Sequence, residues 1–105
     1  MSADEFQVVI MTAPSLDEAE RIAETLVEER LAGCVNMSGC RSVYRWQGKI
    51  EKDEEVLMLA KTRASKFAAI EKRVTELHSY DVPEIIAVDL KSLSAGYLGF
   101  LEDVC

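Results

Sequence analysis

The stretch from Cys40 to Arg63 constrains the fold most, because it has the pattern of two strands joined by a turn. Residues 41–47 (RSVYRWQ) place side chains on alternate sides, with the two-residue period of a strand. Gly48 and the polar residues 49–55 are predicted to turn the chain, and residues 56–60 (VLMLA) to return it. The returning arm is apolar throughout, so we expect both of its faces to be covered.

The first arm of this hairpin carries two large aromatic side chains, Tyr44 and Trp46, beside arginines that a small core would not bury. One face of such an arm can pack on its own domain while the other meets a second molecule. Aromatic residues of this kind are enriched at the centres of protein interfaces. We therefore predict that Tyr44 and Trp46 anchor contact with an identical subunit, with ligand stacking as their second role.

The chain before the hairpin predicts a strand and then a helix. Residues 6–12 are branched and apolar, as in a central strand. Ser15 has the position of a helix N-cap, and Glu18 three residues later would complete a capping box. An apolar stripe then extends to about Leu31, and Gly33 is placed to end the helix in the left-handed conformation.

The other elements follow from the same kinds of pattern. In order, we expect an extended segment over 34–37, a bend or bulge at Ser38-Gly39, a helix after Thr62 capped by Ser65, a loop over 78–81, a strand over 84–90, and a short last helix capped by Ser94 or Ser92.

This order of elements predicts an α+β fold, the ferredoxin-like split β-α-β arrangement, as one domain over residues 1–105. Right-handed crossovers place both long helices on one face of an antiparallel sheet. The other face would expose residues 56–60 and 85–88, which are too apolar to remain in water. We therefore expect self-association.

Composition limits the partners and the compartment. A formal net charge of −7 argues against nucleic acid and anionic membranes as partners, since both require a basic surface. The first residues are acidic and lack a signal-peptide pattern, and no apolar run is long enough for membrane insertion. The three cysteines contain no C-x-x-C pair and do not have the spacing of a structural zinc site. A cytoplasmic protein with reduced thiols is expected.

Catalytic motifs are weak. His78 is the one histidine, and neither a nucleophile elbow nor a phosphate-binding loop is present. Cys34 and His78 both fall at the ends of elements, where they could form a thiol–imidazole pair. The favoured interpretation of Cys34 is a small buried hydrophobic residue, and the chain is predicted not to be an enzyme.

Metal binding is open at this point. His78, Cys34, Cys40, Met11 and Met58 are soft or borderline ligands that suit copper or zinc. They lie in separate elements, so only the tertiary structure can bring them together. A lone histidine after a helix is more often a hydrogen-bonding residue than a ligand.

Two charged features have several interpretations. Lys61 ends an apolar strand, where it can extend to solvent, pair with a carboxylate such as Glu84, or hold an anionic ligand. The acidic residues among 51–55 can attract hard cations, but a solvated hairpin tip is the preferred interpretation.

Several segments together resemble the CutA family, the divalent-cation tolerance proteins. The matching segments are 12–14 (TAP), 31–36 (LAGCVN), 42–51 (SVYRWQGKIE), 61–62 (KT), 78–85 (HSYDVPEI) and 97–101 (YLGFL). They span most of the chain in the family's order. The resemblance implies a ferredoxin-like fold in a PII-like homotrimer built by strand pairing between subunits. It also implies a cytoplasmic bacterial protein linked to tolerance of copper and other divalent cations.

The resemblance also implies a site. Family clefts between subunits gather the residues that correspond to Cys34, Tyr44, Trp46, Lys61, His78, Tyr80 and Glu84. Family members proposed to bind copper have a cysteine where this chain has Met11, and a His-His pair where it has Leu77-His78. His78 and Met11 are therefore the metal ligands that the resemblance predicts. The alternative function is a PII-like signalling adaptor whose trimer binds a small metabolite in these clefts and docks on a membrane or enzyme partner.

Overall fold

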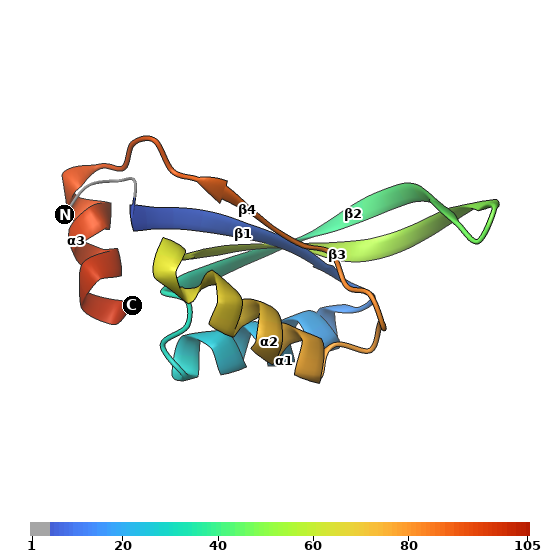
Figure 1. Ribbon diagram of the computed structural model, residues 1–105, viewed down its shortest axis with the longest axis horizontal. Coiled ribbons are helices and arrows are strands. Elements are labelled where there is room, and N and C mark those ends of the chain that lie inside the picture. Colours follow the sequence, from blue (N-terminus) through green and yellow to red (C-terminus); the bar gives the residue numbers. More distant parts are fainter. Residues whose placement is uncertain (1–4) are drawn as a thin grey trace.

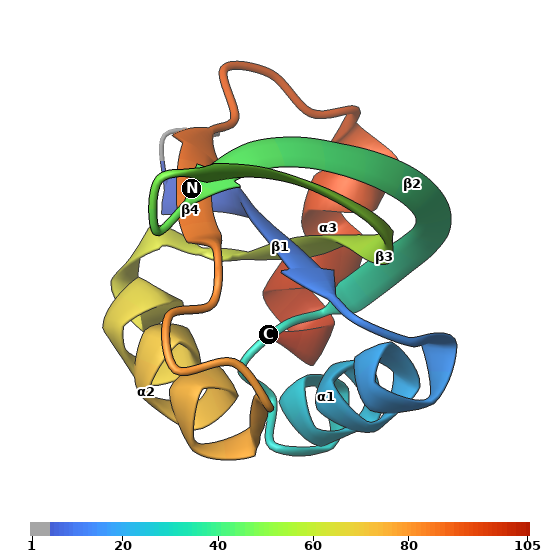
Figure 2. The same cartoon turned by 90° about the vertical axis from the view of Figure 1, so that its right-hand side faces the viewer.

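The computed structural model describes residues 5–105, where four strands form one antiparallel sheet with two helices across one face (Figures 1 and 2). The elements are β1 (Phe6–Ala13), α1 (Leu16–Glu28), β2 (Cys34–Trp46), β3 (Lys49–Arg63), the 3-10 turn η2 (Ala64–Lys66), α2 (Phe67–Leu77), β4 (Ile85–Asp89) and α3 (Ala95–Val104). The strand order β2-β3-β1-β4 is that of the predicted ferredoxin-like fold. Our expectation about residues 1–4 lies outside the described residues.

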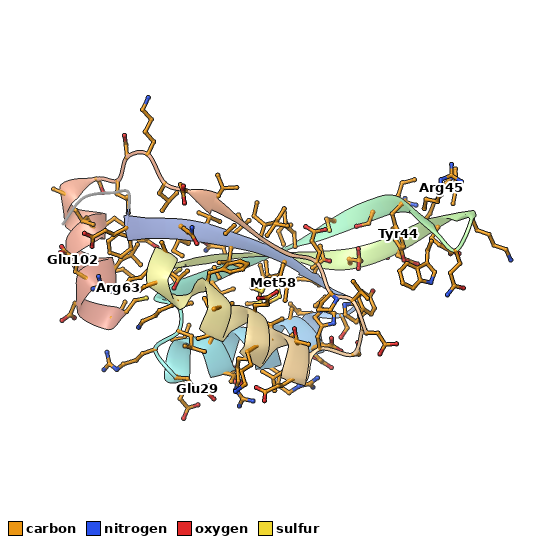
Figure 3. The ribbon with its side chains drawn as sticks, viewed as in Figure 1. Glu29, Tyr44, Arg45, Met58, Arg63 and Glu102 are labelled. Carbon is orange, nitrogen blue, oxygen red and sulfur yellow. The ribbon has the colours of Figure 1, made fainter. Side chains whose placement is uncertain are left out.

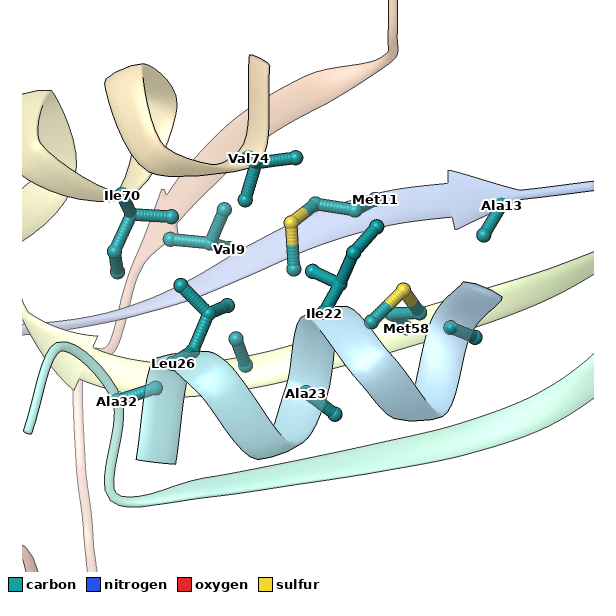
Figure 4. Packing of buried hydrophobic residues seen from close by; sticks show 12 residues of the cluster. Val9, Met11, Ala13, Ile22, Ala23, Leu26, Ala32, Met58, Ile70 and Val74 are labelled. Carbon is teal, nitrogen blue, oxygen red and sulfur yellow. The ribbon is translucent and has the colours of Figure 1, made fainter. Parts of the chain in front are cut away.

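The core lies between the sheet and helices α1 and α2 (Figure 4). Alternate residues of β1, Val9 and Met11 among them, point toward the helices. They meet Ile22 and Leu26 from α1, and Val74 from α2. Full burial of such side chains stabilises a protein by about 1.5–3 kcal/mol each. This layer holds α1 and α2 across the sheet and so positions the loops at its ends.

The hairpin is longer and tighter than the sequence predicted. Its turn is Gln47-Gly48 alone, with φ values of 51° and 80°. Positive φ at both central residues is the requirement of a type I′ turn, which matches the twist of paired strands. The prediction that residues 49–55 form the turn was therefore wrong, because β3 begins at Lys49. The part of the β2–β3 hairpin that extends past the end of β1, called the ribbon below, has solvent on both faces near its tip. Charged residues can therefore occupy a strand there.

The pairing of β2 with β3 has no interruption. The register extends from Cys34 opposite Lys61 to Trp46 opposite Lys49 without a shift. The predicted bend or bulge at Ser38-Gly39 is therefore wrong. As a result, the ribbon projects beyond the rest of the sheet (Figure 1), and the molecule measures 45 × 25 × 22 Å.

Some helix-end predictions were confirmed and others were wrong. The Oγ atoms of Ser15 and Ser94 accept from the backbone N–H groups at the starts of α1 and α3. Ser65 lies inside η2, and α2 begins without a side-chain cap. Helix α1 ends at Glu28, and the left-handed residue that follows is Arg30, with φ of 58°. Gly33 thus does not end the helix.

The last helix, α3, packs at the end of the sheet opposite the hairpin tip. Arg63 holds it there, because its Nε donates to the Cys105 carbonyl at 2.9 Å and its Nη2 to the Glu102 carbonyl at 3.2 Å (Figure 3). The Arg63 guanidinium also lies 5.2 Å from the centre of the buried Phe6 ring. The two hydrogen bonds fix α3 to β3, and the ring contact joins β3 to β1. Within residues 5–105, no helix has the length and apolar character to cross a membrane.

The sheet face opposite α1 and α2 is apolar and partly bare. Residues that lie directly opposite one another in neighbouring strands share a face, so the β1–β3 and β1–β4 registers show which side chains lie here. This face carries Val8, Ile10, Leu57, Leu59, Ile86 and Val88. Ile86 and Val88 are 51% and 53% exposed. Both faces of the 56–60 strand were predicted to be covered, and in a single chain only the helix-facing side is.

Gly33 allows α3 to approach closely, and Gly33→Ala should destabilise the protein. A Cβ atom at Gly33 would lie 2.8 Å from Leu101 Cδ2 and 2.9 Å from Val104 Cγ2. We expect a loss of about 1–3 kcal/mol in the free energy of unfolding, the usual cost of overpacking. Urea unfolding measures this loss. The control is Gly39→Ala, because no atom lies within 4 Å of its added Cβ. Equal losses in the two variants would contradict the close-approach explanation.

Candidate functional site

A cavity of about 450 Å³ opens where the projecting hairpin passes the end of β1 and the loop between α2 and β4. Such a volume suits a small organic molecule. Three separate parts of the chain contribute to its wall. The lining residues are Thr12, Tyr44, Trp46, Glu55, Tyr80, Asp81, Val82 and Glu84.

The register of the hairpin places its lining residues on one face. Tyr44 lies opposite Glu51, and Trp46 lies opposite Lys49. Because side chains alternate along a strand, Glu55 lies on the same face of the hairpin as these two pairs. Trp46 is 50% exposed and Tyr44 is 39% exposed, whereas Glu55 is 8% exposed. The cavity therefore has open aromatic walls and a buried carboxylate.

Both tyrosines of the cavity donate their hydroxyl protons to carboxylates. Tyr80 Oη donates to Glu55 Oε2 at 3.0 Å, and Tyr44 Oη donates to Asp53 Oδ2. Burial, and then the bond to Glu55, raises the pKa of Tyr80 to about 12. The bond to Asp53, followed by burial, raises the pKa of Tyr44 to about 12. Both phenols therefore stay neutral at physiological pH, and each hydroxyl proton is already donated to a carboxylate.

His78 lies behind the cavity and orients Tyr80. Its Nδ1 accepts from the Tyr80 backbone N–H at 3.0 Å, so we assign the ring proton to Nε2, which lies 2.8 Å from the Thr12 carbonyl oxygen. The His78 and Tyr80 rings are 4.8 Å apart. Glu18 closes the network, since its Oε2 accepts from the Ser79 N–H and hydroxyl at 3.1 and 3.0 Å. The carboxylate expected in a capping box thus holds the 78–80 loop instead.

The structure brings together only part of the predicted cleft. Tyr44, Trp46, Tyr80 and Glu84 line the cavity, and His78 contacts it through Tyr80. Two other predicted residues lie elsewhere in the same chain: Cys34 pairs with Lys61 at the other end of β2 and β3. Lys61 is also opposite Val8, near the opposite end of β1 from Glu84, so the proposed Lys61–Glu84 pair does not form within one chain.

The residues present do not fit the predicted copper pair. Both ring nitrogens of His78 are engaged, one by Tyr80 and one by Thr12. Met11 is 1% exposed and faces the core, across from Met58. Across residues 5–105, no group of three or more His, Cys, Asp or Glu residues is arranged to hold a metal ion. His78 acts here as a structural hydrogen-bonding residue, and a metal would have to displace one of its two bonds.

Sequence reasoning missed four lining residues. Thr12, Asp81 and Val82 had no sequence signal that assigned them to a site, although 12 and 81–82 lie within the family-matching segments. Glu55 was assigned to a solvated hairpin tip, because residues 49–55 were predicted to turn the chain. With those residues assigned to a strand, the two-residue period places Glu55 on the same face as Tyr44.

Comparisons with known proteins agree on one family. Residues 7–104 match the model of the CutA1 divalent ion tolerance protein family. "Divalent-cation tolerance protein CutA" of Thermus thermophilus is 46% identical over 92% of this chain and 95% of its own length. "Protein CutA 1, chloroplastic" of Oryza sativa is 41% identical over 91% of this chain and 55% of its own length.

A solved structure agrees with the fold. The structure described as the periplasmic divalent cation tolerance protein CutA from Archaeoglobus fulgidus superposes with a TM-score of 0.93. It is 40% identical and is matched over 94% of this chain and 97% of its own.

The raised pKa values of the two tyrosines predict a loss of stability at high pH. Tyrosine ionises near pH 10 in the unfolded chain, whereas the folded pKa values of Tyr80 and Tyr44 are about 12. The unfolded state therefore loses protons first, and the free energy of unfolding should fall between pH 10 and 12. Tyr80→Phe should make this fall less steep. The variant lacks one of the two phenols, so the difference in bound protons between the folded and unfolded states decreases by up to one per chain. Urea unfolding at several pH values measures it, and an unchanged slope would contradict the assigned Tyr80 environment.

Proposed function

The chain belongs to the CutA1 divalent ion tolerance family, and we propose that it acts as a homotrimer whose clefts bind a small ligand. The relatives are named as tolerance proteins, and a binding role agrees with those names. The cavity supports this role, because it is concave and has aromatic walls, as ligand sites typically do.

The bare sheet face is the observation that carries the proposed assembly. Ile86 and Val88, on the edge strand β4, are half-exposed and belong to an apolar surface that neither α1 nor α2 covers. A monomer rarely leaves such a surface in water. The sheet also ends in two different edge strands, β2 and β4. Pairing of unlike edges is a head-to-tail contact, which closes into a ring when the rotation permits. A trimeric ring covers the apolar faces and removes both edges.

Assembly also accounts for the divided site. Cys34 and Lys61 lie at one end of the β2–β3 pair, and Tyr44 and Trp46 lie at the other. A single chain cannot bring these four residues into one cleft. In the trimer that we propose, a neighbouring subunit supplies Cys34 and Lys61 to the cavity that Tyr44 and Trp46 line.

We place this function in the cytoplasm. Cys34, Cys40 and Cys105 are all free thiols, which suits a reducing compartment. Relatives carry the words "chloroplastic" and "periplasmic" in their names, so the family is not confined to one compartment. Fractionation of the native cells checks this placement, and recovery of the protein outside the cytoplasm would refute it.

A PII-like adaptor is the second candidate function, and the hairpin tip favours it. The ribbon extends away from the main sheet (Figure 1), and its tip exposes Val43 and Ile50 by 67% and 62%. Exposed apolar residues on a projecting element offer a contact for another protein. An adaptor requires a metabolite that stabilises it, so a thermal-shift screen of anions and nucleotides separates it from a plain binding protein.

The proposed assembly predicts the effect of a charge in the sheet face. Wild type should have three times the chain mass of 11.7 kDa by light scattering. Ile86→Lys places an ammonium group in the covered surface and should shift the mass toward that of one chain. Val27→Lys is the control, because Val27 is similarly exposed (45%) but belongs to α1. A trimer mass for Ile86→Lys, or dissociation of both variants, would refute this interface.

The engagement of both His78 nitrogens predicts weak copper binding. We expect chelator-competition titrations of the reduced protein with Cu(I) and Cu(II) to give the same weak binding for wild type and for His78→Ala. His78→Ala should instead lower the free energy of unfolding by about 1–3 kcal/mol, because it leaves the buried Thr12 carbonyl without its partner. Tight stoichiometric copper binding that the substitution abolishes would contradict our assignment.

A further inference from the structure

We propose that the cavity binds a small organic cation, with an alkylammonium group against the Tyr44, Trp46 and Tyr80 rings and the carboxylates around them. This inference rests on the proposed role of the cavity as a ligand site, and it adds the chemical class of the ligand. Three properties of the wall carry it: the sign of its charge, the direction of its hydroxyl protons and the spacing of its carboxylates.

The charge of the wall is negative. Glu55, Asp81 and Glu84 line the cavity, and Asp53 adjoins it through the Tyr44 hydroxyl. Among the described residues that line the cavity, none is Lys, Arg or His. In the trimer that we propose, Lys61 of a neighbouring subunit adds one ammonium group, and the wall stays net negative because its carboxylates outnumber that group. An anionic ligand would therefore meet net repulsion. A cation would be attracted, and most strongly by Glu55, because its side chain is the least hydrated of the three.

The hydroxyl protons of the wall point away from a ligand. Tyr80 donates to Glu55 and Tyr44 donates to Asp53, so both phenols offer a ligand oxygen lone pairs and ring faces but no proton. Trp46 adds a half-exposed indole face. Aromatic faces attract cations through the negative potential above the ring, and tryptophan does so most strongly. The wall is therefore rich in acceptors and complementary to a donor cation.

The size and spacing of the wall favour an organic cation over a metal ion. A hard metal ion requires about six oxygen atoms within roughly 2.0–2.6 Å. Residues 5–105 place no such group of ligands together, and the three carboxylates come from β3 and from two points of the α2–β4 loop. The cavity of about 450 Å³ has room for a carbon skeleton that carries its charge to separated carboxylates.

Trp46 makes the site directly observable, because it is the only tryptophan in the chain. We would titrate the native protein with choline chloride and with spermidine, at constant ionic strength set with sodium chloride, and record tryptophan fluorescence. We expect a saturable change with at least one of them, with Kd near or below about 1 mM. Sodium chloride alone should give no saturable change.

Two substitutions localise the binding. Glu55→Gln should raise the Kd of the responding cation by about tenfold or more, because it removes a desolvated charge next to the ligand. Glu84→Gln, at an exposed position that does not support the fold, should raise it in the same direction by about threefold or more. Glu54→Gln is the matched control, since it removes the same charge from the opposite face of β3 and should leave Kd unchanged.

Several outcomes would overturn the inference. One is that neither cation gives a saturable response. Another is that Glu54→Gln raises Kd as much as Glu55→Gln does, which would indicate a diffuse electrostatic attraction instead of a site. A tighter response to inorganic phosphate or to Mg²⁺ would keep the cavity as a ligand site and reject an organic cation as its ligand. Light scattering on the same samples tests the trimer independently of cation binding. A trimer without a cation response refutes this inference alone, whereas a monomer that responds to a cation refutes the trimer alone.

Discussion

The unbroken pairing of β2 with β3 is the interaction on which the rest of the structure depends. Its type I′ turn at Gln47-Gly48 sets the register, and a shift by one residue would move every side chain of the ribbon to the other face. Tyr44 and Trp46 would then leave the cavity, and Glu55 would lose its place beside Tyr80. The same pairing separates the Cys34 end of the hairpin from the aromatic end, and in the trimer that we propose a neighbouring subunit brings the two ends together.

The cavity is connected to the core through the loop that follows α2. Glu18, on α1, holds Ser79, and His78 joins the Thr12 carbonyl to the Tyr80 backbone. Tyr80 in turn donates to Glu55. These bonds position the aromatic wall from behind, so the histidine that sequence motifs offer as a metal ligand has a structural role. In the trimer that we propose, this preorganised wall forms half of each cleft.

The proposed chemistry follows from where protons already lie. Each tyrosine hydroxyl in the wall is satisfied by a carboxylate, and the wall has lone pairs and ring faces left to offer. Such a surface selects against anions and accepts ammonium donors. A link between divalent-cation tolerance and this cleft therefore does not require that a metal ion bind there.

The sequence by itself determined the order of elements and much of the local structure. The caps at Ser15 and Ser94, the helical stripes and the strand periods depend on neighbours within a few residues, and they correctly indicated the ferredoxin-like fold. The tertiary structure alone decided that Glu55 faces the cavity, that the His78 nitrogens are occupied, and that Gly33 serves α3 instead of α1. These properties depend on strand register and on contacts between distant segments, which no local pattern of side chains specifies.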